Sequence, residues 1–146
     1  MPIYEDLSPY VYLPSEVPMK NVGWLGVNSF PLGRMPERAR DELLRIASEG
    51  AENMMRGTQD CPLCGLETPV RVPTSYNERG WVSIGNGEYH VVDSSGTVFA
   101  APTLLWHYIN DHQYLPPQEF IDALLLSAEA RSARGEGELR EAGSGS

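Results

Sequence analysis

The chain has 146 residues, 41% of them hydrophobic, which is enough for one core of ordinary size and makes a single domain the default expectation. Its formal net charge of −9 disfavours contact with nucleic-acid backbones and favours a basic protein as partner, although acidic charge also serves solubility alone. No run approaches the ~18 apolar residues of a membrane span, and the N-terminus has neither the basic nor the apolar segment of a signal peptide. We therefore expect a cytoplasmic protein without membrane contact.

Residues 1–34 combine five prolines with five aromatic side chains. The prolines exclude a long helix, and the aromatic content is too high for a disordered tail. We expect an extended segment that wraps across the domain and packs on it, with short strands at residues 10–13 and 22–27. The functional alternative is an exposed aromatic groove for a peptide.

The clearest helix is predicted to start at Pro36 and to finish by Gly57. Its apolar residues recur at steps of three and four, which forms one stripe along the helix. Gly50 is a candidate interruption. The stripe consists of Ala39, Leu43, Ile46, Ala47 and Met54.

From residue 68 to residue 101 the pattern changes to short β segments separated by turns that contain glycine and serine. The predicted strands are Val70–Val72, Trp81–Ile84, Glu88–Val92 and Thr97–Ala100. Residues 93–96 are typical of a hairpin turn. The Gly85–Gly87 stretch lacks the lysine and helix that follow a phosphate-binding loop, which favours a tight turn.

A second helix is predicted to open at Pro102 and to contain His107, and a third is predicted from Pro117 through Leu125. Residues 132–146 have almost nothing to bury, so we expect a flexible tail after a globular domain of residues 1–131.

The only two cysteines form a Cys-x2-Cys pair, Cys61 and Cys64, and 42 residues after it comes the histidine pair His107 and His112. A disulfide between such close cysteines would restrain the unfolded chain little. Two thiolates and two imidazoles suit tetrahedral zinc, and four protein ligands make such a site structural. The long spacer makes it an expanded finger. Five residues of ideal helix rotate by about 140°, so we expect the helix to end near His112 if both rings are to reach the metal.

The same residues also allow functions other than structural zinc binding. If His112 swung away, a water-bearing catalytic zinc would remain, with Asp111 or Glu88 as base. His90 is a competing ligand.

Two further alternatives are disfavoured by the local sequence. Thiol–disulfide exchange by the cysteine pair is disfavoured because Gly65 and Pro69 prevent the helix that would activate it. A DNA-reading finger is disfavoured because residues 102–115 contain no lysine or arginine.

Several short motifs resemble a family of small uncharacterised bacterial proteins, a domain of unknown function. They are Tyr-Glu-Asp-Leu-Ser-Pro-Tyr at residues 4–10, Asn-Val-Gly-Trp-Leu at 21–25, the stretch from Arg56 to Cys64, and the stretch from Ala100 to Pro117. The resemblance covers about residues 4–125. It implies a bacterial, single-domain, zinc-holding protein and supplies no activity.

The sequence therefore predicts an α+β domain with a short antiparallel sheet, about three helices and a structural zinc ion on Cys61, Cys64, His107 and His112. We expect a non-enzymatic domain that binds another protein, for example an acidic immunity-type protein or inhibitor of a basic partner. The alternative is a zinc-dependent enzyme of unknown reaction.

Overall fold

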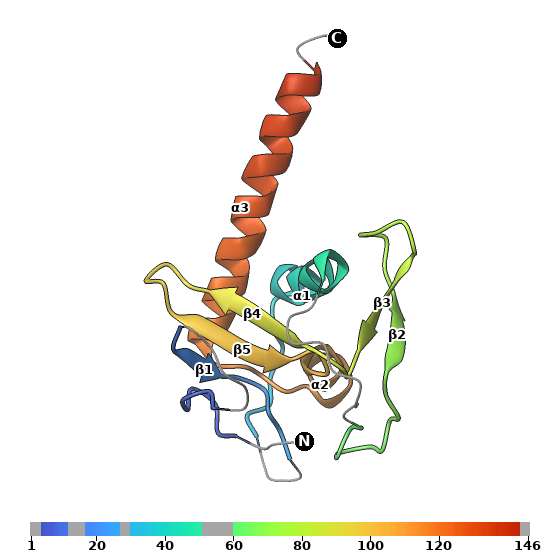
Figure 1. Cartoon of the computed structure of the whole chain (residues 1–146), viewed down its shortest axis with the longest axis vertical. Helices are drawn as coiled ribbons and strands as arrows, with labels where there is room; N and C mark the ends of the chain where they lie inside the picture. Colours follow the sequence, from blue (N-terminus) through green and yellow to red (C-terminus); the bar gives the residue numbers. More distant parts are fainter. Residues whose placement is uncertain (1–3, 12–16, 27–29, 51–59, 144–146) are drawn as a thin grey trace.

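The computed structural model describes residues 4–11, 17–26, 30–50 and 60–143, and for residues 134–143 it describes the backbone alone. The fold is α+β, as predicted, with two small sheets and helices around them (Figure 1). Its strands are β1 (Met19–Asn21), β2 (Val70–Pro73), β3 (Trp81–Ile84), β4 (Glu88–Val92) and β5 (Val98–Pro102). Its helices are α1 (Glu37–Glu49), α2 (Leu105–His112) and α3 (Gln118–Gly143).

One sheet has the strand order β1-β5-β4, and the other is the separate β2–β3 hairpin. In the first sheet β4 and β5 are antiparallel and β1 lies parallel to β5. The turn between β4 and β5 is the predicted hairpin turn, in which the Asp93 carboxylate accepts hydrogen bonds from the backbone N–H groups of Ser95 and Thr97. The 85–87 turn joins β3 to β4 and so connects the two sheets.

The N-terminal strands differ from the prediction. The described strand in this region is β1, which ends at Asn21, one residue before the predicted strand 22–27 would begin. Val22 still donates its backbone N–H to the carbonyl of Ala100 but does not continue the strand. Gly23 has φ +76°, a left-handed conformation that turns the chain away from the sheet. Residues 12, 13 and 27 of the predicted strands lie outside the described residues.

Two helix boundaries also differ from the prediction. Helix α1 begins directly after Pro36 but ends at Glu49, because Gly50 adopts φ +120°. Met54 lies outside the described residues. Pro102 does not open a helix: it is the last residue of β5, paired with Glu88, and α2 begins three residues later.

Helix α3 begins directly after Pro117, packs on α1 and β4, and projects beyond the rest of the molecule (Figure 1). Its backbone is helical as far as Gly143, so most of the predicted tail has regular backbone structure. The flexibility of residues 132–146 and the domain boundary at residue 131 stay predictions. Among the described residues, no helix is long and apolar enough to cross a lipid bilayer.

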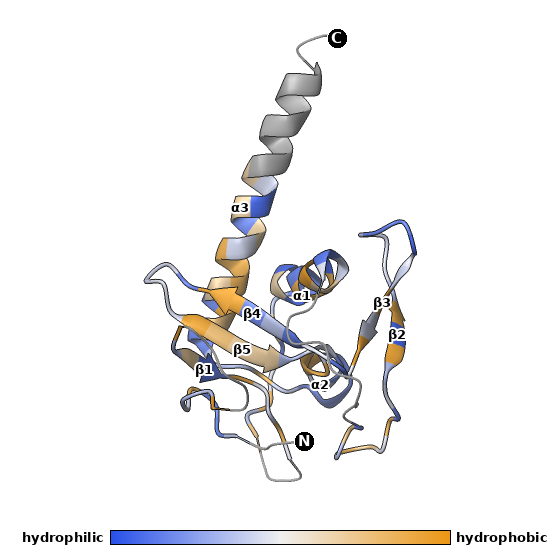
Figure 2. Cartoon of the chain, viewed as in Figure 1, coloured by the Kyte–Doolittle hydropathy of each residue, from blue (hydrophilic) through white to orange (hydrophobic). Residues whose placement is uncertain are grey.

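The core lies between the first sheet and helices α1, α2 and α3, and Figure 2 shows hydrophobic residues in β4, β5 and the adjoining part of α3. The N-terminal segment carries a second cluster. Trp24 is buried there, stacks edge-on with Tyr4 at 5.9 Å between ring centroids, and donates its indole N–H to the carbonyl of Ala100 at 3.0 Å. The segment is also fastened to the connection between α2 and α3, since the Tyr114 hydroxyl donates to Asp6 at 2.7 Å.

Candidate metal centre

A tight turn aims the two cysteine side chains toward one point. The Gly65 N–H donates to the carbonyl of Cys61 at 2.9 Å, and the Cys61 N–H donates to the carbonyl of Leu66 at 3.0 Å. Gly65 makes this closure possible with φ +77°. Cys61 is buried, at 2% exposed, whereas Cys64 is exposed, so one thiol faces the core and the other faces solvent.

The two histidines lie on α2, with His112 as its last residue. Gln113 follows in a left-handed conformation, φ 56°, which ends the helix at the position expected from the spacing of the two histidines. The two imidazole rings are nearly perpendicular, at 87°, with 4.9 Å between their centroids. The termination of α2 at His112 agrees with the expectation that both rings reach the cysteines.

Each histidine nitrogen lies beside a different cysteine sulfur. Cys61 Sγ is 3.5 Å from His112 Nε2, and Cys64 Sγ is 3.4 Å from His107 Nε2. All four ligand atoms lie within 4.8 Å of one another. Zinc–sulfur and zinc–nitrogen bonds of about 2.3 and 2.0 Å at the tetrahedral angle place sulfur and nitrogen about 3.5 Å apart. The two sulfur–nitrogen separations therefore match a tetrahedral site, and the four side chains lie close enough together to bind a metal ion.

Asp111 orients one of the ligands. Its Oδ2 lies 2.7 Å from Nδ1 of His107, which precedes Asp111 by one turn of α2. A proton on Nδ1 leaves the lone pair of His107 on Nε2, which is the atom that faces Cys64. Metal-binding histidines commonly have such a carboxylate partner. From the sequence, Asp111 was expected only as a base in the enzymatic alternative, although the sequence does contain its i,i+4 spacing from His107.

Burial shifts the pKa values of two of the four ligands. Burial raises the pKa of the Cys61 thiol, and the neighbouring Cys64 raises it further. Burial lowers the pKa of His107, with His112 acting in the same direction and Asp111 opposing both. The lowered pKa favours the neutral imidazole that a metal ligand must be. A bound cation would reverse the preference of the Cys61 thiol for its protonated form and hold it as a thiolate.

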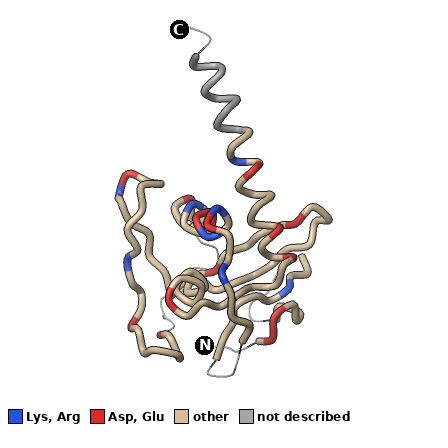
Figure 3. Tube along the Cα trace, turned by 180° about the vertical axis from the view of Figure 1, so that it is seen from behind, with Lys and Arg blue, Asp and Glu red and all other residues tan. Residues whose placement is uncertain are grey.

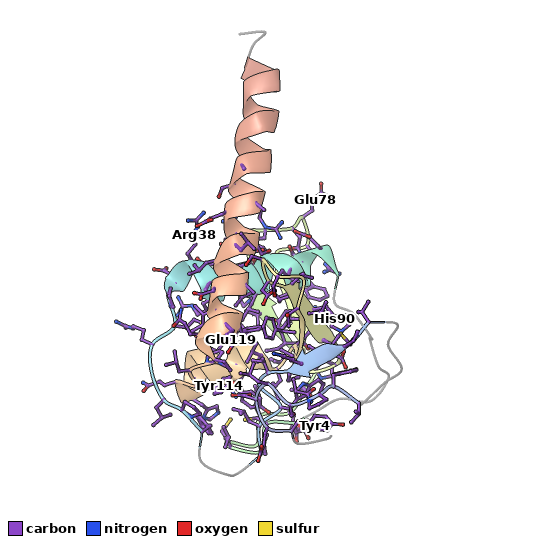
Figure 4. All side chains as sticks on the ribbon, turned by 90° about the vertical axis from the view of Figure 1, so that its left-hand side faces the viewer. Tyr4, Arg38, Glu78, His90, Tyr114 and Glu119 are labelled. Atoms are coloured by element: carbon purple, nitrogen blue, oxygen red, sulfur yellow. The ribbon has the colours of Figure 1, made fainter. Side chains whose placement is uncertain are left out.

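Two other predicted candidates, His90 and Glu88, lie away from the four ligands. His90 Nε2 is 2.9 Å from Glu88 Oε1, and the Tyr10 hydroxyl donates to Glu88 Oε2 at 2.7 Å. This group lies on the first sheet, where Figure 4 labels His90, and it does not belong to the metal cluster. His90 therefore does not replace any of the four predicted ligands, and Glu88 is committed to Tyr10 and His90.

Fold and site together define an α+β domain with a candidate Cys2His2 metal centre between the loop that precedes β2 and the end of α2. The chain belongs to the family described as Domain of unknown function (DUF7919), whose model matches residues 2–125. Comparisons with curated proteins and with solved structures gave no match.

Proposed function

We propose that this protein is a non-enzymatic interaction domain whose fold depends on one structural zinc ion held by Cys61, Cys64, His107 and His112. The observation that carries the proposal is the convergence of four Cys and His ligand atoms within 4.8 Å. Two soft thiolates and two imidazoles are a ligand set that favours zinc.

The position of the centre supports a structural role. It joins the cysteine loop to α2, and these segments are separated in the sequence by strands β2 to β5. Four protein ligands complete a tetrahedron and leave no position for a substrate or an activated water. Asp111, the nearest candidate base of the enzymatic alternative, is engaged with His107.

The net charge of −9 supports a basic protein as partner, because opposite fields accelerate association. An acidic inhibitor or immunity-type protein has this character.

The metal centre is tested by elemental analysis of protein purified without added metal, with one zinc ion per chain as the expected result. Cys61→Ser and His107→Ala should each lose the zinc and melt about 10 °C lower, because zinc at about 1,000 times its Kd contributes about 4 kcal/mol to folding. His90→Ala is the matched control and should keep its zinc. A metal-free wild-type protein that is folded and has two reactive thiols would refute the centre.

A further inference from the structure

The β2–β3 hairpin has an inner face toward α1 and an outer face on the opposite side. Its register places the pairs Val70–Ile84 and Val72–Val82 on the inner side, where Val72, Val82 and Ile84 are buried. Side chains alternate along a strand, so the pairs Arg71–Ser83 and Pro73–Trp81 lie on the outer side. Figure 1 shows this hairpin standing apart from the first sheet, with α1 and α2 between them.

Two arginines of the hairpin lie over one tryptophan. The guanidinium carbons of Arg71 and Arg79 are 4.0 and 4.8 Å from the centroid of the Trp81 ring, and both arginines are exposed. A third arginine, Arg45 of α1, lies over Tyr76 at 4.6 Å. Within the described part of the chain, neither Arg71 nor Arg79 has an ion pair or a hydrogen bond from its guanidinium. The indole holds both groups in place while their N–H donors stay free for an external acceptor.

This arrangement is unexpected in a chain of net charge −9. Residues 70–84 contain Arg71 and Arg79 against the single acid Glu78, a charge of 2 − 1 = +1, so the other residues sum to −10. Figure 3 shows basic positions along the hairpin, while acidic positions predominate on the body. We call Arg71, Arg79 and Trp81, with Pro73 and Ser83 beside them, the Arg–Trp surface.

We propose that the Arg–Trp surface binds an extended peptide segment of a protein partner through the carboxylates of its Asp or Glu side chains. A guanidinium matches a carboxylate with two parallel hydrogen bonds, and two oriented guanidinium groups select closely spaced carboxylates. Arginine and tryptophan are also the side chains that dominate binding energy at protein interfaces. Stacking on Trp81 lowers the entropy that each arginine loses when it binds.

Two other modes of binding fit less well. A nucleic acid would have to stack a base on the indole face of Trp81, and that face is occupied by guanidinium groups. Addition of a peptide strand to the free edge of β2 is blocked by Pro73. The Thr74 N–H donates to the carbonyl of Gly80, so residues 74 and 80 form a hydrogen-bonded pair of the ladder. Hydrogen-bonded pairs alternate with pairs whose backbone groups point outward, so the backbone of Pro73 faces the free edge, where proline has no N–H to donate.

The zinc centre sets the position of this surface, because β2 follows the cysteine loop. At the base of the hairpin, Thr68 packs so closely on Gly85 that a Cβ at residue 85 would lie 2.4 Å from Thr68 Cβ. The proposal thus rests on the proposed interaction function and on an intact metal centre. Zinc content measured on every binding sample separates failure of the surface from failure of the centre.

The test uses the zinc-loaded full chain and a fluorescein-labelled hexaglutamate peptide, with binding followed by fluorescence anisotropy at low salt. Hexaglutamate should bind, and Arg71→Gln and Arg79→Gln should each weaken binding about fivefold. Arg38→Gln is the matched control: it removes the same charge from α1, where Arg38 contacts Ser132, and Figure 4 shows it across α3 from Glu78 at the hairpin tip. It should keep nearly full affinity.

Three results would overturn the proposal. One is absence of hexaglutamate binding to zinc-loaded wild type, and another is an equal loss in the Arg38 variant, which would mean that net charge alone acts. The third is tighter binding of a single-stranded oligothymidylate of the same length, which would identify the surface as one for nucleic acid. Variants that bind weakly while retaining one zinc per chain would support it.

Discussion

At the scale of single residues, the candidate centre consists of four ligands and one orienting carboxylate. The ligands were readable from the sequence because the chain has only two cysteines, and their spacing matches a common zinc motif. The contact between Asp111 and His107 was not predicted, since an i,i+4 spacing on a helix is frequent and does not by itself show that a side chain turns toward its neighbour.

Asp111→Ala should weaken zinc binding by about tenfold or more, because His107 loses the partner that holds its proton on Nδ1. Competition against a coloured zinc chelator measures this affinity. Asp122→Ala removes an equal charge from α3, where the Asp122 carboxylate accepts a hydrogen bond from Gln118, and serves as the control. Equal affinities of the two variants would show that Asp111 does not orient the ligand.

At the scale of elements, α1 and α3 are joined by a buried ion pair. Glu42 is completely buried, and its carboxylate accepts hydrogen bonds from Arg131 Nε at 3.0 Å, Arg131 Nη2 at 3.1 Å and the Ser127 hydroxyl at 2.5 Å. Arg131 also contacts Glu49. The partners are 89 residues apart, so no local pattern in the sequence indicated this pair.

Arg131→Met should destabilise the protein by about 3 kcal/mol, because it leaves the Glu42 carboxylate buried without its counter-ion. The double variant Glu42→Leu with Arg131→Met removes both charges and should recover much of that loss. Urea unfolding of the three proteins measures the difference. If the double variant is less stable than the single one, the ion pair itself contributes net stability and the desolvation argument is wrong.

The turn between the two sheets supplies a second test at this scale. Gly85 has φ +102° and touches Thr68, whereas Gly96 has φ +88° with open space where a Cβ would lie. Gly96→Ala should therefore cost only the backbone strain, about 1 kcal/mol, and Gly85→Ala should cost about 3 kcal/mol because it adds a steric clash. Equal losses in thermal or urea unfolding would mean that the contact with Thr68 is not tight.

Elements defined by local interactions were predicted correctly, whereas elements defined by pairing with distant residues were not. Strands β3 and β4 have the predicted boundaries, since alternation and turn residues are local signals. Strand β1 was missed because it is defined by parallel pairing with β5, far along the chain, and by a left-handed Gly23. Pro102 was assigned to a helix because proline favours helix starts, but pairing with Glu88 places it at the end of a strand.

At the scale of the whole molecule, length and composition predicted one domain with an acidic charge, the residue patterns predicted an α+β class, and the fold agrees with that class. The distribution of charged side chains over the surface could not be predicted from the sequence. Only the register of β2 and β3 shows that Arg71 and Trp81 share an outer face, which makes the hairpin a basic region on an acidic body.

The −9 charge leads to the last prediction, which concerns association with other molecules. The protein should not bind duplex DNA at physiological salt, and it should bind a basic protein with an on-rate that falls as salt is added. Raising the ionic strength from about 0.01 M to about 0.15 M shortens the Debye length from about 30 Å to about 8 Å, which removes the long-range attraction between opposite fields. Pull-down from native lysate, followed by stopped-flow binding across this salt range, measures the effect. Submicromolar binding to DNA, or a partner whose on-rate does not change with salt, would show that the acidic charge serves solubility and does not guide association.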